Sequence, residues 1–338
     1  MAVTLVFAIN APAFAQNGPG DPVTPRASGL GAPLAVVADP YGDFIVSDRD
    51  SNHVWWVTTD GRKEIITREV PGPTGLGWDV FANLLIVGAH GVYKLNPQGK
   101  VSQMFADDYI SDVALAPDGT LWFSSSFGSG LLRHYDAVGN LIEVKNAGIS
   151  AGQSGPDQLA FSSSGELFYS AHGAAGGSTV YRMAGNQSTV LFSVPWTVYD
   201  IAIDAGGNLY VVNANENHID RYSAFGARLD NPFATVNTPT GIAFGRNADG
   251  SMNKRLFAVQ HDGTLVELNA AGVQQPGGPV GFATTAQVIA DLLKPGSALS
   301  DQQRHVLDAV GNRNGRFDVG DLRAFLIFNS TLSAAHAH

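Results

Sequence analysis

Three aspartates, Asp112, Asp157 and Asp200, have the type and spacing that could build a cation site or an acid–base site. Each stands at the start of a strand-like segment, and successive ones are separated by 45 and 43 residues. A divalent cation such as Ca²⁺ takes six to eight oxygen ligands, among which carboxylates are common. Further oxygen donors lie beside these positions: Ser111, Gln158 and Tyr199. The alternative is that Asp112 and Asp200 accept hydrogen bonds from backbone N–H groups of neighbouring loops.

A second group of oxygen donors lies near the C-terminus, where the spacing matches a calcium loop. With Gly315 as the sixth position, donors occupy the third, fifth, seventh (through its carbonyl), ninth and twelfth positions: Asn312, Asn314, Arg316, Asp318 and Asp321. Val310 at the first position has no donor, so Asp308 would have to reach in. The segment resembles the loop of dockerin modules and EF-hands, which implies Ca²⁺ binding and docking to a cohesin-like partner. The alternative is an ordinary Asn-Gly turn between two helices.

A repeated turn glycine predicts the scaffold that would bring the three aspartates together. It recurs six times at intervals of 38 to 46 residues: Gly61, Gly99, Gly139, Gly185, Gly226 and Gly272. Each glycine follows one strand-like run and precedes another, and a period of about 40 with four short strands is typical of a propeller blade. We expect the first strands of the six blades at residues 35–38, 75–78, 112–115, 158–161, 200–203 and 241–244.

The sixth blade lacks a convincing last strand of its own. Residues 274–279, which follow its third strand, contain two prolines and are a poor candidate for a strand. We therefore predict that Val23–Ala27, near the beginning of the chain, completes blade 6 and closes the ring.

Two stretches carry a recognisable repeat motif: Asn208-Leu209-Tyr210-Val211-Val212 with Asn217-His218-Ile219 in blade 5, and Pro239-Thr240-Gly241-Ile242-Ala243 in blade 6. They resemble the NHL repeats of six-bladed propellers. The resemblance implies an all-β six-bladed propeller over residues 29–283, followed by a small α-helical EF-hand-like or dockerin-like module over residues 284–330. Within that module we expect a short helix at Thr285–Leu293.

One face of a propeller carries the starts of the first strands and the loops between second and third strands, and ligands usually bind there. The first position of this column is filled by Leu34, Thr74, Ser111, Asp157, Tyr199 and Thr240. The next position is filled by Ala35, Gly75, Asp112, Gln158, Asp200 and Gly241. The three aspartates are therefore predicted on adjacent blades near the channel mouth, where a second divalent cation could bind.

The chain is also similar in fold to the gluconolactonase and senescence-marker propellers, which place Glu, Asn and Asp in this column around a divalent cation. Asp157 alone matches that pattern. The peptidyl-amidating lyase propellers place three histidines in the same column, and no residue here matches theirs.

Three histidines, His90, His172 and His261, end predicted second strands or begin the loops that follow them. A shared zinc ion would need one nitrogen of each histidine within about 2.1 Å of the metal. Second strands a third of a turn apart in the ring would instead place the histidines more than about 10 Å from each other. We expect solvated loop histidines; the alternative is that one of them, such as His172, acts alone as a base. Most tryptophans are expected to pack within the blades, and Trp196, at a blade entrance, is the candidate for stacking on a sugar.

Composition narrows the partners and the compartment. The 338 residues include 39 glycines, 17 prolines and no cysteine, and the formal net charge of −10 argues against a nucleic-acid partner. Met1–Ile9 is apolar and Ala13-Phe14-Ala15 fits a cleavage site, so residues 1–15 indicate a signal peptide and a secreted protein. No later stretch reaches the length of about 20 apolar residues that a membrane span needs.

These observations predict a secreted binding protein. Its propeller face would recognise a glycan, a peptide or a small ligand, and its calcium-binding C-terminal module would attach it to a cohesin-like or cell-surface partner. The alternative is a metal-dependent hydrolase or lyase of the gluconolactonase-like propeller type, with Asp112, Asp157, Asp200 and His172 as the candidate catalytic residues. A third possibility is a structural surface protein.

Overall fold

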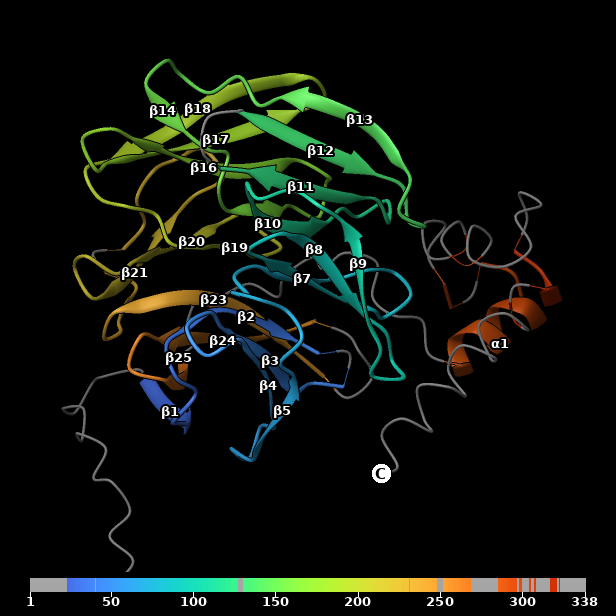
Figure 1. Cartoon of the computed structure of the whole chain (residues 1–338). Helices are drawn as coiled ribbons and strands as arrows, with labels where there is room; N and C mark the ends of the chain where they lie inside the picture. Colours follow the sequence, from blue (N-terminus) through green and yellow to red (C-terminus); the bar gives the residue numbers. More distant parts are fainter. Residues whose placement is uncertain are drawn as a thin grey trace, which may run out of the picture.

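The computed structural model describes residues 23–39, 41–126, 130–230, 232–247 and 252–268, together with residues 285–296, 298–299, 304, 307, 317–320 and 322. In this part of the chain, 25 strands form six antiparallel sheets arranged around a common axis (Figure 1). The prediction of a six-bladed propeller is confirmed, and its first strands lie within two residues of their expected ends.

Blades 1, 2, 3 and 5 each consist of four strands that are consecutive in the sequence. Blade 1 contains β2 (Pro33–Ala38), β3 (Phe44–Asp48), β4 (His53–Val57) and β5 (Lys63–Thr67). Blade 2 contains β6 (Leu76–Trp78), β7 (Leu84–Gly88), β8 (Gly91–Leu95) and β9 (Val101–Phe105). Blade 3 contains β10 (Ile110–Leu115), β11 (Leu121–Ser125), β12 (Leu131–Tyr135) and β13 (Leu141–Asn146). Blade 5 contains β19 (Ile201–Ile203), β20 (Leu209–Asn213), β21 (His218–Tyr222) and β22 (Ala234–Thr235).

Blade 4 differs because its innermost position is divided between two short strands. Both β14 (Gln153–Ser154) and β15 (Leu159–Phe161) pair with the second strand of the blade, β16 (Leu167–Gly173). The outer strands are β17 (Ser178–Ala184) and β18 (Gln187–Val194). Of the residues between β14 and β15, Asp157 and Gln158 still form backbone hydrogen bonds with Ser170 of β16.

Blade 6 is closed by the beginning of the chain. Its sheet runs β23 (Pro239–Arg246), β24 (Met252–Gln260), β25 (Thr264–Leu268) and then β1 (Val23–Ala27). Antiparallel pairing places Val23 opposite Leu268 and Thr24 opposite Glu267. The predicted closure by Val23–Ala27 is confirmed, with the same bounds.

Six separate apolar clusters occupy the spaces between blades, one at each of the six blade-to-blade junctions. The second strands lie at the centre of these layers, and every residue of β3, β7, β11 and β20 is buried. A strand that is covered on both faces needs apolar side chains in succession, which explains runs such as Leu84–Gly88. The ring is thus held together by packing of sheet faces.

Aspartates shape the tight turns at the far end of the channel, opposite the starts of the first strands. Asp79 Oδ1 accepts hydrogen bonds from the backbone N–H groups of Phe81 and Asn83, each at 2.9 Å. Asp39 and Asp204 cap their turns in the same way. This local hydrogen bonding is the reason why Asp is favoured at the first position of such turns.

The predicted helix at Thr285–Leu293 is confirmed as α1. No EF-hand is seen in the C-terminal residues that the structure describes. Asp318 Oδ1 accepts a hydrogen bond from Gly320 N at 2.7 Å, as a capping residue does. The other predicted calcium ligands lie outside the described residues: Asp308, Asn312, Asn314, Arg316 and Asp321. The predicted signal peptide, residues 1–15, lies outside them too, and no described helix has the length and apolar character to cross a bilayer.

Candidate functional site

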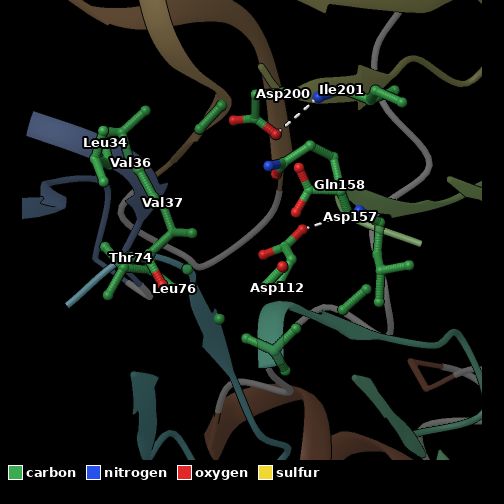
Figure 2. Close-up of a pocket in the computed structure, with 18 of the residues that line it drawn as sticks. Leu34, Val36, Val37, Thr74, Leu76, Asp112, Asp157, Gln158, Asp200 and Ile201 are labelled. Carbon is green, nitrogen blue, oxygen red and sulfur yellow. Dashed lines mark hydrogen bonds between the residues drawn. The ribbon is translucent and has the colours of Figure 1, made fainter. Parts of the chain in front are cut away.

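The first strands of the blades surround a cavity of ≈ 620 Å³ on the propeller axis. All six residues predicted at the first position of the column line it: Leu34, Thr74, Ser111, Asp157, Tyr199 and Thr240. Asp112, Gln158 and Asp200 from the next position line it as well. Figure 2 shows the three aspartates and Gln158 along one wall, facing apolar residues of blades 1 and 2. The cavity therefore has one polar, acidic wall and one apolar wall.

Asp112 and Asp200 hold neighbouring blades together. Asp112 Oδ2 accepts the backbone N–H of Leu159 in blade 4 at 2.9 Å, and Asp200 Oδ2 accepts that of Ile242 in blade 6 at 2.8 Å. The other oxygen of Asp200 accepts the N–H of Ile201 at 2.7 Å. This arrangement confirms the alternative in which both side chains bond to the backbone of neighbouring segments.

Burial controls the protonation of these two aspartates. Removal from water, followed by repulsion from Asp200, raises the pKa of Asp112 well above its usual value. Burial likewise raises the pKa of Asp200 to about 7, against the lowering effect of its two backbone hydrogen bonds. The wall therefore holds less negative charge at neutral pH than three carboxylates would suggest.

Asp157 lies between β14 and β15, and its backbone bonds to the second strand of its blade as those of Thr74 and Tyr199 do in blades 2 and 5. Gly155 begins the segment between β14 and β15 with a φ of +129°, and a Cβ there would lie 3.1 Å from Ala171 Cα. The carbonyl of Asp157 accepts a hydrogen bond from Ser124 Oγ in blade 3 at 2.5 Å. Its N–H donates to Ser170 O at 2.9 Å. The backbone of Asp157 is thus fixed from two blades.

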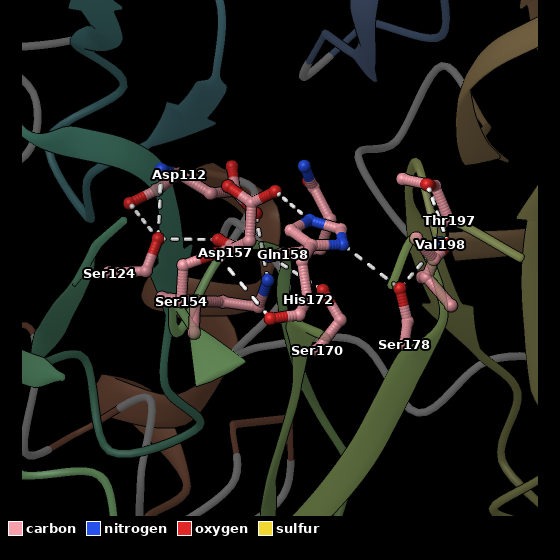
Figure 3. A network of polar contacts seen from close by, with 12 residues as sticks. Asp112, Ser124, Ser154, Asp157, Gln158, Ser170, His172, Ser178, Thr197 and Val198 are labelled. Atoms are coloured by element: carbon pink, nitrogen blue, oxygen red, sulfur yellow. Dashed lines mark hydrogen bonds and ion pairs between the residues drawn. The ribbon is translucent and has the colours of Figure 1, made fainter. Parts of the chain in front are cut away.

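His172 and Asp157 form a hydrogen-bonded pair at the mouth of the cavity (Figure 3). His172 Nε2 lies 2.5 Å from Asp157 Oδ2, and His172 Nδ1 lies 2.9 Å from Ser178 Oγ. Ser178 Oγ also accepts the N–H of Val198 at 3.0 Å. A neutral imidazole satisfies this network when Nε2–H donates to the carboxylate and the serine hydroxyl donates to Nδ1. Asp157 Oδ1 is left without a hydrogen bond to a described residue.

This geometry corrects the expectation of three solvated histidines. His172 is partly buried and bonded at both ring nitrogens, whereas His261 is exposed and His90 pairs loosely with Asp108 at 3.3 Å. His172 therefore does not act alone, because Asp157 and Ser178 fix its ring.

The three aspartates do not fit a shared cation. Both oxygens of Asp200 and one oxygen of Asp112 are occupied by backbone N–H groups, and Asp157 is bonded to His172. In the part of the chain that the structure describes, no three His, Asp or Glu side chains are grouped as metal ligands would be.

The expectation that Trp196 stacks on a sugar is wrong. It is buried with Val198 and Phe168 in the cluster between blades 4 and 5. Tyr199 is the aromatic side chain of this segment that reaches the mouth, where 39% of it is exposed.

Two arginines of the cavity wall were not predicted from the sequence. Arg49 lines the mouth from the loop after β3, and the buried Arg246 lines the wall from the end of β23. Arg49 could have been found, because loops between second and third strands share the face of the predicted column. Nothing in the local sequence distinguishes Arg246.

Solved structures with the same architecture carry out different functions. The chain superimposes on a candidate gluconolactonase from structural genomics with a TM-score of 0.61 and 20% identity, over 76% of this chain and 94% of that one. A calcium-binding regucalcin from Agrobacterium tumefaciens gives a TM-score of 0.58 and 17% identity, over 74% and 92%. Virginiamycin B lyase from Staphylococcus aureus gives a TM-score of 0.54 and 14% identity, over 73% of this chain and 97% of that one.

At these identities the likeness shows the fold alone. No protein-family model matches the chain, and no curated protein is detectably similar to it. The resemblance to NHL repeats therefore stands on the sequence motifs alone.

Proposed function

We propose that the propeller binds a small polyhydroxylated molecule, such as a sugar or a short glycan, at the mouth of its axial cavity. The observation that carries this proposal is the cavity of ≈ 620 Å³ with one polar and one apolar wall. Cavities of about 300–1,000 Å³ with a few placed polar groups are typical of small-molecule sites.

The wall chemistry suits a ligand with a hydroxylated edge and an apolar face. Gln158 and Ser111 can each donate and accept hydrogen bonds, and Asp157 Oδ1 is available as an acceptor. The half-exposed ring of Tyr199 offers a surface on which a sugar ring can pack. The leading function is therefore recognition.

A binding screen tests this proposal. Calorimetry against monosaccharides, sugar acids and short oligosaccharides should find a ligand whose affinity falls at least about tenfold in Gln158→Ala and in Tyr199→Ala, since each removes about 1.4 kcal/mol or more of contact. Tyr41→Ala is the matched control, because Tyr41 has a similar exposure of 47% on a turn at the far end of the channel. Equal losses in Tyr41→Ala and Tyr199→Ala would contradict the assignment of the site.

The second candidate is a hydrolase or lyase related in function to the gluconolactonase-like propellers. The pairing of His172 with Asp157 favours it, because a carboxylate held by an imidazole at a cavity mouth can act as a general base. Asp157 Oδ1 is the open atom of the pair, so Asp157 would take the proton and His172 would position it. Ser178 keeps the imidazole in the required tautomer.

Activity assays distinguish the two candidates. Lactones, esters and sugar acids are offered to the wild type, to Asp157→Asn and to His172→Gln. An enzyme should lose at least about a hundredfold in rate in Asp157→Asn, whereas a binding protein shows no turnover above the Asp157→Asn background. The assays are repeated with added Ca²⁺ and Mg²⁺ and after chelation.

The C-terminal module and the compartment remain part of the same proposal. We propose that residues 284–330 bind Ca²⁺ and attach the protein to a cohesin-like or cell-surface partner, and that residues 1–15 direct secretion. Calcium titration of the full chain should show binding in the millimolar range that Asp321→Ala removes, as extracellular modules of this type do. N-terminal sequencing of exported protein should begin at Gln16.

A further inference from the structure

The outer strand of blade 3, β13, differs from the other outer strands of the propeller. Leu141, Ile142 and Val144 are 51%, 53% and 44% exposed. In the described propeller, β18 has one exposed large apolar residue, Val190, and β1, β5, β9 and β22 have none. A sheet edge of this kind offers unpaired backbone groups together with apolar side chains.

β13 ends its sheet. It pairs with β12 along one side, and no described strand pairs with its other side. Figure 1 shows it on the outer rim of the ring. Outer strands usually carry charges that discourage pairing, as Lys63 and Glu64 do on β5. On β13 the two charges, Glu143 and Lys145, are paired with each other at 3.1 Å.

We propose that β13 is the self-association site of this protein, and that a second copy adds its own β13 in antiparallel orientation. In a two-fold pair centred on Val144, Glu143 of each copy lies directly opposite Lys145 of the other. A pair centred on Ile142 would set Glu143 against Leu141. Of these two registers, the one centred on Val144 is therefore the one in which the charges are complementary. In it, the Val144 side chains of the two copies lie next to each other on the sheet face opposite Glu143 and Lys145.

Contacts within one copy also hold the Lys145 side chain. Lys145 Nζ lies 2.8 Å from Asn186 Oδ1 of blade 4 and 5.3 Å from the centre of the Trp122 ring. Lys145 is therefore fixed in direction before a second copy arrives. A pair of short strands is smaller than a standard protein interface, so the dimer is expected to form at micromolar concentrations.

Charge exchange tests the proposal. Sedimentation of the full chain up to about 100 μM should show a concentration-dependent dimer. Glu143→Lys and Lys145→Glu each place like charges across the interface and should weaken the dimer at least about tenfold. The double variant carrying both changes restores opposite charges in the same register, so its dimer should return to the affinity of the wild type.

Glu64→Lys is the matched control, since it changes the net charge equally on the exposed outer strand of blade 1. Its dimer should be unaffected, and thermal melts should show all four variants folded. A wild type that stays monomeric, a double variant no better than the single ones, or an equal loss in Glu64→Lys would each overturn the proposal.

Discussion

The clasp between the beginning of the chain and blade 6 provides the sharpest test of how the ring is closed. Glu267 on β25 accepts hydrogen bonds from Arg26 Nε of β1 at 2.8 Å and from Arg255 Nε of β24 at 2.7 Å. Arg26→Ala removes the link to β1 and keeps the link within the original three strands. Arg255→Ala removes the link within the original three strands and keeps the link to β1, which makes it the matched control.

The expected cost of Arg26→Ala is about 1–2 kcal/mol. A hydrogen bond to a charged group contributes about 1.5–3 kcal/mol, and the value is reduced here because 34% of the Arg26 side chain is exposed to solvent. For a propeller of this size the melting temperature should fall by about 2–4 °C. Exchange of the backbone amides of β1 should rise by about tenfold, since β1 opens more often.

The acid dependence of this effect has a definite sign. Burial raises the pKa of Glu267, but the hydrogen bonds from Arg255 and Arg26 outweigh it, and the pKa is lowered. The stabilisation is therefore present above the unfolded pKa of about 4.3 and is lost as the pH falls through the folded value. Wild type and Arg26→Ala should converge in stability in acid. Faster exchange in β1 with Arg255→Ala but not with Arg26→Ala would refute this account of closure.

Three further changes should give measurable effects. The pKa of Asp200 is raised to about 7 in the folded state, so the folded protein keeps this proton up to a higher pH than the unfolded chain does. As the pH rises from about 4 to about 7, the free energy of unfolding of the wild type should therefore fall by up to about 4 kcal/mol relative to that of Asp200→Asn. Chemical denaturation at each pH will show this difference. Gly155→Ala should cost about 1–3 kcal/mol in a thermal melt because of its positive φ and the contact with Ala171. Tyr169→Phe should cost about 1–2 kcal/mol in urea, because the buried hydroxyl donates to the carbonyl of Ala147.

The architecture could be predicted because every blade repeats the same local signals. The turn glycines fixed the period, and the starts of the first strands could be aligned without knowing any contact. All six aligned positions line one cavity as a result. The closure by Val23–Ala27 could be predicted because the prolines in the sequence of residues 274–279 make that segment a poor fourth strand for blade 6.

The candidate site could be predicted only in part, because its key contact depends on the direction of one side chain. The alignment placed Asp157 correctly, since its backbone bonds to β16 match those of Thr74 and Tyr199 to their second strands, but it did not show that the Asp157 side chain bonds to His172, 15 residues further along the chain. An alignment of repeats gives the place of a residue in its blade, but not the partner that its side chain contacts. The burial of Trp196 was missed for a related reason, since the approach of blade 5 decides whether a side chain at a blade entrance is covered.

The hydrogen bonds that join neighbouring blades around the mouth largely use main-chain atoms of the rim. Ser47 Oγ bonds to the carbonyl of Thr74 at 2.8 Å, Ser124 Oγ to that of Asp157, and Thr240 Oγ1 to that of Pro33 at 2.7 Å. Every amino acid has a backbone carbonyl, so the side chain of each accepting residue can be replaced while its inter-blade hydrogen bond persists. Libraries that randomise Thr74 and Asp157 while conserving the donor serines should therefore yield folded proteins with new ligand preferences.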